Sequence, residues 1–294
     1  MWLLVGGDSE IGAATYRFLK ARGDAVAATT RRRKRVAADR PWLDLSGSLA
    51  DWEPPAGLRG ACVFAGVARL AACASDPTGS AHINVTQTLA VIERLLARAV
   101  PVVFLSTNQV FDGRIANVPP DAAACPISEY GRQKARTEAA LREHMERGAP
   151  ISILRLAKVV SPDMPLIHAW VDALAAGQPI RAFHDMTMAP TPIGLATAAI
   201  AALLDEGMQG IFQLTGGSDV TYVQVGRFVA DWLRADPALV TAMSACDAGL
   251  PEGATPQHTT LDSSLVRKRY GVAVPGPWEV VEQVIAARQK QAPA

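Results

Sequence analysis

Short apolar runs alternate with segments of helical periodicity through the first half of the chain. Runs typical of buried strands are expected at residues 2–5, 25–29, 61–65, 102–106 and 151–156. Between them, apolar residues recur at spacings of three and four, which predicts helices near residues 11–21, 81–97 and 129–146. Strands that alternate with helices in this way are typical of a parallel sheet covered by helices, so the pattern predicts an α/β fold.

The pattern changes after Leu156. Stretches punctuated by proline and glycine lead to helices expected near residues 195–204 and 223–234, a short strand at 211–214 and a proline-rich tail. We therefore predict two parts. Residues 1–156 form the sheet domain, and residues 157–294 form mainly a smaller α/β region that faces the substrate, with some segments returning to the sheet.

Charge and cysteine content narrow the classes of partner. The 29 Lys and Arg nearly balance the 28 Asp and Glu, which excludes the basic footprint of a nucleic-acid or membrane-surface binder, so a small-molecule partner is expected. The four cysteines show no CxxC spacing, and neither a metal site nor a disulfide is predicted. An apolar strand follows Met1 directly, and no apolar run reaches the roughly 18 residues of a membrane span, so a cytoplasmic protein is expected.

A glycine-containing loop joins the first strand to the first helix, in the sequence Gly6-Gly7-Asp8-Ser9-Glu10-Ile11-Gly12. In this context glycines let the backbone approach a pyrophosphate, and the helix N-terminus offers free N–H groups. The sheet is therefore predicted to be a doubly wound Rossmann sheet, with dinucleotide contacts from Gly6, Ser9, Glu10, Ile11 and Gly12. The middle glycine of the usual motif is replaced by Ser9 or Glu10, so a ligand-free turn stays the alternative.

The end of the second strand indicates which dinucleotide is bound. A NAD-binding domain usually has an acid about 20 residues beyond the loop, whereas this chain has Arg31 and Arg32. A guanidinium suits a 2′-phosphate, so NADP(H) is favoured. Two alternatives stay open: that NAD(H) is the cofactor, and that the arginines form only a solvated basic turn. Asp44 and Leu45 follow a third short strand and are expected near the adenine, unless Asp44 is an ordinary turn residue.

Tyr130 and Lys134 are candidates for proton transfer. Their spacing of four places both on one helix face, where the ammonium is expected to lower the tyrosine pKa from its reference value near 10. The preceding strand ends in Ser106 and Thr107, which presents hydroxyls at the edge where such sheets bind ligands. A second Tyr-x-x-x-Lys pair, on the first helix, is interpreted as a chance match.

Together these motifs resemble the dTDP-4-dehydrorhamnose reductase family of extended short-chain dehydrogenases. The resemblance rests on residues 6–12, 84–86, 106–113, 130–134 and 153–155, and it continues through 177–179, 210–217, 261–264 and 269–271. It implies that Thr107 contacts the substrate carbonyl, that Tyr130 is the general acid, and that Lys134 binds the nicotinamide ribose and tunes Tyr130. It also implies cofactor contacts from Ala65, Gly66, Val67 and Ser106, and a structural role for Asn84.

Two segments depart from the family pattern. Asn108 and Gln109 stand where the family usually has Asp-Tyr, and this disfavours the dehydratase reaction, which typically needs an Asp-Glu pair there. Residues 156–161 replace an aromatic motif, so the substrate pocket is altered. The resemblance implies NADP(H)-dependent reduction of a keto group on a nucleotide-linked deoxysugar or related intermediate. The alternatives are an epimerase and a non-catalytic cofactor-binding subunit like that of methionine adenosyltransferase; a homodimer and a magnesium requirement are left open.

Overall fold

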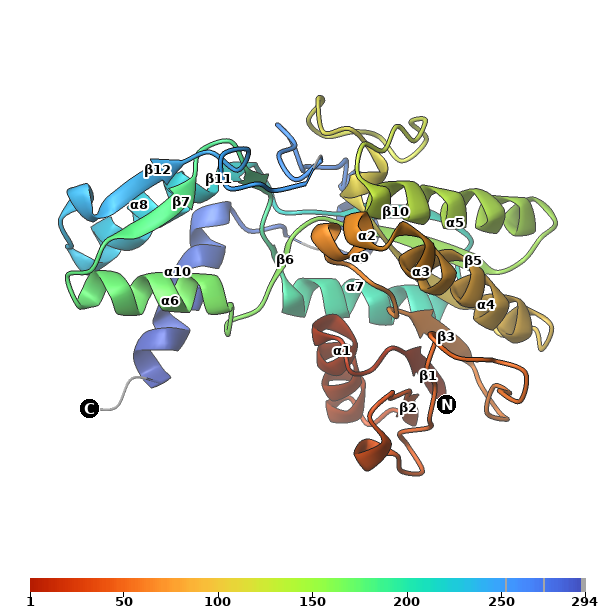
Figure 1. Cartoon of the computed structure of the whole chain (residues 1–294). Helices are drawn as coiled ribbons and strands as arrows, with labels where there is room; N and C mark the ends of the chain where they lie inside the picture. The colour runs from red at the N-terminus through yellow and green to blue at the C-terminus, as the bar shows by residue number, and fades with distance from the viewer. Residues whose placement is uncertain (252, 272, 292–294) are drawn as a thin grey trace.

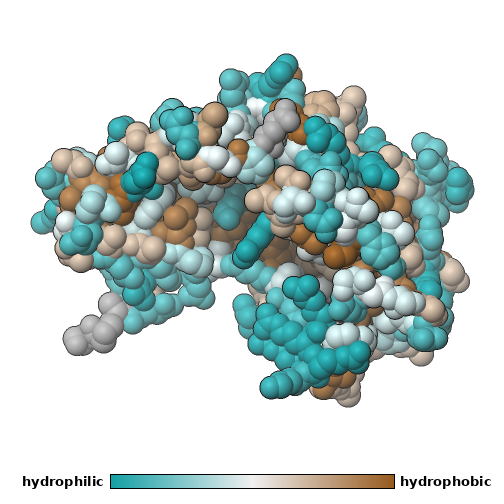
Figure 2. Space-filling view, viewed as in Figure 1, coloured by the Kyte–Doolittle hydropathy of each residue, from teal (hydrophilic) through white to brown (hydrophobic). Residues whose placement is uncertain are grey.

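The computed structural model describes residues 1–251, 253–271 and 273–291. The molecule has two lobes (Figure 1): a sheet domain with helices on both faces, and a smaller region that carries the C-terminal helix. A space-filling view of the same side shows the surface hollowed between the two lobes (Figure 2). None of the helices in these described residues is long and apolar enough to cross a membrane.

The central sheet has six strands, all parallel, in the order β10-β5-β4-β3-β1-β2. They are β1 (Trp2–Val5), β2 (Val26–Ala28), β3 (Gly60–Val63), β4 (Val102–Thr107), β5 (Ile151–Leu156) and β10 (Gly210–Leu214). The chain proceeds from β1 outward to β2 and then returns to place β3 on the other side of β1. This reversal creates a switch point at the carboxyl ends of β1 and β3, where such sheets bind ligands. The predicted α/β Rossmann fold is confirmed.

Both faces of the sheet are buried, which is why its strands read as continuous apolar runs. Leu4 of β1 packs into a core with helices α1 (Glu10–Ala21) and α7 (Ile193–Glu206). Leu3 and Val5, on the other face of β1, pack into a core with α4 (Thr88–Leu96) and α5 (Glu129–Glu146). The alternation follows from the two-residue period of a strand.

The C-terminal region has a core of its own. Helices α6 (Pro165–Ala175), α8 (Tyr222–Leu233) and α10 (Pro277–Gln291) pack beside the parallel pair β7 (Ile180–Phe183) and β12 (Val240–Met243). Two of its segments, α7 and β10, lie in the sheet domain. The division after residue 156 stays a prediction.

Several predicted elements differ in detail. The short strand expected before Asp44 is a single bridge between Thr30 and Trp42, and the expected proline-rich tail contains the 15-residue helix α10, which Pro277 opens. The helix expected over residues 81–97 begins with a π-helical segment at His82–Gln87 and continues as α4. The remaining elements are α2 (Leu70–Ser75), α3 (Pro77–Ala81), α9 (Ser264–Tyr270), β6 (Val159–Val160), β8 (Thr187–Met188), β9 (Thr191–Pro192) and β11 (Val220–Thr221).

Candidate active site

The glycine loop turns tightly between β1 and α1. Gly6 has a φ of +97°, and a Cβ there would lie 2.7 Å from the backbone nitrogen of Ala65. A Cβ on Gly12 would lie 2.5 Å from the carbonyl oxygen of Gly6. Ser9 caps α1, because its Oγ accepts a hydrogen bond from Gly12 N at 3.1 Å. Glycine is therefore required at both ends of the loop, and Ser9 serves as the helix cap.

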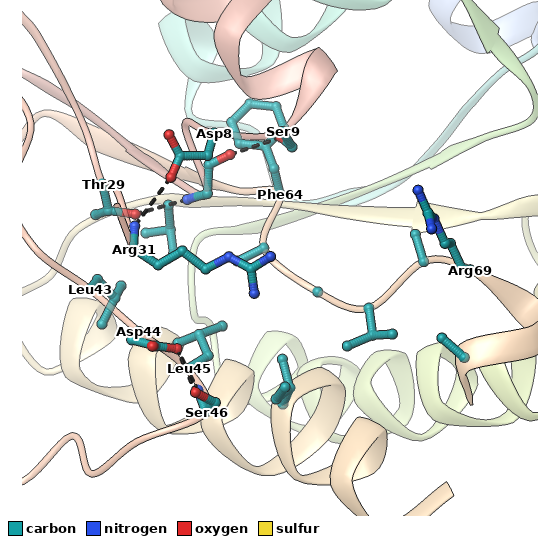
Figure 3. Close-up of a pocket in the computed structure, with 18 residues that line it drawn as sticks. Asp8, Ser9, Thr29, Arg31, Leu43, Asp44, Leu45, Ser46, Phe64 and Arg69 are labelled. Carbon is teal, nitrogen blue, oxygen red and sulfur yellow. Dashed lines mark hydrogen bonds between the residues drawn. The ribbon is translucent and has the colours of Figure 1, made fainter. Parts of the chain in front are cut away.

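A cavity of about 350 Å³ lies at the switch point (Figure 3), at the carboxyl ends of β1, β2 and β3. Eight of the predicted cofactor residues line it: Gly6, Ser9, Arg31, Asp44, Leu45, Ala65, Gly66 and Val67. The lining does not include Glu10, Ile11, Gly12, Arg32, Ser106, Tyr130 or Lys134. The cavity lies where Rossmann domains in general bind the adenosine half of a dinucleotide, because its walls are the glycine loop and the strand ends at the switch point.

Two charged side chains that line the cavity, Asp44 and Arg31, are labelled in Figure 3. Asp44 is fixed by Ser46, whose N–H and Oγ–H both donate to Asp44 Oδ1 at 3.0 and 2.8 Å. These hydrogen bonds, with a smaller effect of Arg31, hold the pKa of Asp44 below its usual value. Arg31 lies across from Asp44 in this view.

Arg32 does not lie where the prediction placed it. Arg32 does not line the cavity; its Nε lies 4.0 Å from Asp8 Oδ2, and its side chain is 56% exposed. Asp8, which the sequence analysis did not single out, lines the cavity and binds the end of β2. The acid was missed because it comes from the glycine loop rather than from the strand that usually supplies it.

The catalytic candidates lie at the end of β4 and the start of α5. Thr107 is the last residue of β4, and Tyr130 is in the first turn of α5, which Ser128 caps. A side chain at Gly131 would collide with the carbonyl oxygen of Gln109, so the start of α5 is pressed against the turn that follows Thr107. This packing explains the glycine after Tyr130 and brings the tyrosine close to Thr107.

Lys134 lies one helical turn after Tyr130 and is buried. Its Nζ donates a hydrogen bond to Leu105 O at 2.8 Å and is 6.0 Å from the centroid of the Tyr130 ring. The ammonium is therefore held against the end of β4, beneath the Tyr130 ring.

The pKa values of this pair differ from the expectation. Burial raises the pKa of Tyr130 well above its ordinary value, Cys73 adds to the increase, and Thr107 opposes it. The net pKa of Tyr130 is therefore raised, not lowered as predicted, because the effect of burial dominates. Burial also lowers the pKa of Lys134 to about 8, against the opposing effects of Glu138 and Cys73.

Ser106 faces the interior. Its Oγ donates to Glu138, whose carboxylate also accepts two-pronged hydrogen bonds from Arg155 Nε and Nη2, at 3.0 and 2.7 Å to separate oxygens. The cofactor contact predicted for the Ser106 hydroxyl is not supported, because the pleat of β4 turns this side chain toward α5. The buried pair of Glu138 and Arg155 was missed, although an arginine inside the apolar run of β5 was a signal.

Asn84 connects the two halves of the site. Its side chain pairs with both the N–H and the carbonyl of Val67, at 2.7 and 2.9 Å, and it donates to Gln133 Oε1 at 2.7 Å. Val67 belongs to the cavity and Gln133 to α5, so Asn84 ties the cavity wall to the helix that carries Tyr130. This geometry matches the anchoring role expected for it.

The model of the RmlD substrate binding domain family matches residues 1–289. The chain belongs to this family. A relative from Haloferax volcanii, named probable low-salt glycan biosynthesis reductase Agl14, is 30% identical over 210 residues, which is 69% of each chain.

Two solved structures show how widely the fold of this RmlD family member is shared. The Thermus thermophilus UDP-glucose 4-epimerase in complex with NAD has a TM-score of 0.80 at 20% identity, covering 99% of this chain and 100% of that chain. The Bacillus anthracis dTDP-4-dehydrorhamnose reductase in complex with NADP has a TM-score of 0.78 at 14% identity, covering 97% of each chain. The predicted class, an NAD(P)-dependent oxidoreductase of the extended short-chain type, is confirmed.

The structure shows where the two departures from the RmlD family sequence lie. Asn108 and Gln109 form the turn after β4, and both present neutral amides: Asn108 Oδ1 is 3.4 Å from Thr107 Oγ1, and Gln109 Oε1 accepts from Ser128 Oγ at 3.0 Å. Lys158 is exposed between β5 and β6.

Proposed function

We propose that this protein uses a nicotinamide dinucleotide, NADP(H) in preference to NAD(H), to reduce a keto group on a nucleotide-linked sugar or deoxysugar. The observation that carries the proposal is the grouping of Thr107, Tyr130 and Lys134 at the carboxyl end of β4, joined through Asn84 to the wall of the cavity. The family and the reductase named among the relatives support it.

The bound cofactor would supply a hydride to the carbonyl carbon. Tyr130 would give its phenolic proton to the carbonyl oxygen, so that the ketone gains a hydride and a proton and becomes an alcohol. The raised pKa keeps Tyr130 protonated until the oxygen develops negative charge. Thr107 would orient the carbonyl by a hydrogen bond, and the Lys134 ammonium beneath the ring would stabilise the phenolate that remains.

The turn after Thr107 favours this simple reduction over loss of water. Elimination needs an acid and a base near the sugar, whereas Asn108 and Gln109 carry amides, which do not ionise near neutral pH and cannot act as general acid or base. Their hydrogen bonds with Thr107 and Ser128 fix the turn without adding a charge.

The proposal is tested by incubating the protein and NADPH with a panel of nucleotide-linked 4-keto sugars and following cofactor oxidation and products. Oxidation of one NADPH per alcohol formed is the expected result. An epimerase would interconvert sugars without net oxidation and would retain its dinucleotide through purification. Tight cofactor binding with no conversion of any sugar would contradict catalysis and favour a binding subunit.

A further inference from the structure

Gln133 is a buried amide on α5, one residue before Lys134, and its side chain is 0% exposed. Its Oε1 accepts a hydrogen bond from Asn84 Nδ2 at 2.7 Å, and its Nε2 donates to Ser80 Oγ at 2.8 Å and to Glu129 Oε1 at 2.9 Å. One enclosed side chain therefore joins the first turn of α5 to α3 and to the π-helical segment that follows α3.

The direction of these hydrogen bonds is fixed at both ends. Backbone groups cannot exchange roles, so Asn84 Oδ1 must accept from Val67 N and Asn84 Nδ2 must donate to Val67 O. Asn84 therefore presents only a donor to residue 133, whereas the ionised carboxylate of Glu129 can only accept. Residue 133 must offer an acceptor on one side and a donor on the other, which a glutamine does and a carboxylate does not.

These hydrogen bonds act on the turn that carries Tyr130. Tyr130 follows Glu129 in the first turn of α5, where backbone N–H groups have no partners inside the helix. The Ser128 cap and the hydrogen bond from Gln133 to Glu129 hold this turn, and the network continues through α3 and the π-helical segment to the cavity wall. The place of the phenol relative to the cavity thus depends on Gln133.

We propose that Gln133 is a positioning residue for the reduction: its amide sets the place of the Tyr130 phenol relative to a cofactor bound in the cavity. Gln133 does not touch the reacting atoms, because its side chain is fully enclosed. The inference rests on the proposed function, since it requires that Tyr130 protonates a ketone that receives its hydride from that cofactor.

A purely structural role for Gln133 predicts a different result. If the amide only stabilised the fold, its loss would lower the melting temperature and leave kcat of the folded protein unchanged. A positioning role predicts a lower kcat with nearly unchanged binding of substrate and NADPH, because no group that binds either of them is removed.

The experiment measures kcat and KM for the best 4-keto sugar, and Kd for NADPH, in the wild type, Gln133→Met and Gln133→Glu. In both variants kcat is expected to fall roughly tenfold to a hundredfold, while KM and Kd change by less than about threefold. Gln133→Glu has nearly the same shape as the wild type, but it sets one carboxylate against that of Glu129.

A double variant, Gln133→Glu with Glu129→Gln, is the rescue. It restores a donor at position 129 and keeps an acceptor for Asn84 at position 133, and the Ser80 hydroxyl can donate as well as accept. Its kcat should therefore return to within about threefold of the wild type. A folded double variant that is no more active than Gln133→Glu overturns the inference, as does an unchanged kcat in Gln133→Met.

Gln213→Met is the matched control. Gln213 is also a buried glutamine, but it joins β10 to Val118 O and Asp262 O, so this variant should lose stability and keep the wild-type kcat. If Gln133→Met does not fold, Glu129→Ala replaces it with a loss of kcat in the same direction. A wild type that reduces no keto sugar would overturn the proposed function and the inference with it, whereas an active wild type with an equally active Gln133→Met overturns the inference alone.

Discussion

At the scale of single residues, Lys134 is the group whose charge changes closest to physiological pH in the proposed mechanism. It is buried against Leu105 O and beneath Tyr130, and burial lowers its pKa to about 8. A neutral amine cannot stabilise a phenolate. Loss of the Lys134 proton is therefore expected to limit the reaction at alkaline pH.

We expect kcat/KM for reduction to fall as pH rises through about 8. Lys134 binds fewer protons in the folded than in the unfolded chain between about 8 and its ordinary pKa of 10.5, so its contribution to the free energy of unfolding increases over that window. Activity should therefore fall while stability does not. A pH profile that stays level to pH 10, recorded beside thermal unfolding, would contradict this role.

Arg31 offers a second test at this scale. Arg31→Ala is expected to weaken NADPH by roughly tenfold or more relative to NADH, because a guanidinium forms paired, charge-assisted hydrogen bonds with a 2′-phosphate. Arg33→Ala is the matched control, since Arg33 stacks on Trp42 and does not line the cavity. Equal losses of both cofactors in Arg31→Ala would refute the assignment.

At the scale of elements, the buried ion pair of Glu138 and Arg155 links α5 to β5 next to the catalytic candidates. Both side chains are at most 2% exposed, and Ser106 and Gln213 complete their hydrogen bonds. Removal of one partner would leave a buried charge without compensation, which is strongly destabilising.

Glu138→Gln is expected to lower the free energy of unfolding by about 3–5 kcal/mol. Glu143→Gln, on the exposed side of the same helix, should change it by less than about 0.5 kcal/mol, because its pairing with Arg147 is 68% and 71% exposed. Urea unfolding of both variants measures the difference. A loss of less than about 1 kcal/mol for Glu138→Gln would contradict the claim that this ion pair stabilises the packing of α5 on β5.

The elements that could be predicted are those specified locally. Strands such as β1 and β5 are buried on both faces and therefore appear as uninterrupted apolar runs. The single bridge at Thr30 and the direction of the Ser106 side chain could not be predicted, because they depend on the register between neighbouring strands.

At the scale of the whole molecule, the cofactor half of the candidate site was more predictable than the substrate half. The glycine loop, Arg31 and Ala65 occur at fixed offsets from strands, so the topology brings them to one edge of the sheet. The C-terminal region is assembled from distant segments such as β7 and β12, whose contacts leave no local signal. The helix α10 illustrates this, because its burial against α6 and α8 outweighs the weak pattern of its sequence.

The chain offers an internal control for the proposed chemistry. Tyr16 and Lys20 repeat the Tyr-x-x-x-Lys spacing on α1, but Tyr16 donates to Asp39, away from Thr107 and α5. If the Tyr130 hydroxyl acts in catalysis, its removal should lower activity, whereas removal of the Tyr16 hydroxyl should not.

The most direct test of the account is NADPH oxidation by the wild type, Tyr130→Phe and Tyr16→Phe with the best 4-keto sugar substrate. We expect kcat of Tyr130→Phe to fall by about 10²–10⁴-fold, as for loss of a general acid, while Tyr16→Phe keeps the wild-type rate. Turnover of Tyr130→Phe at the wild-type rate, with cofactor bound normally, would contradict the assignment of Tyr130 as the proton donor and the mechanism that depends on it.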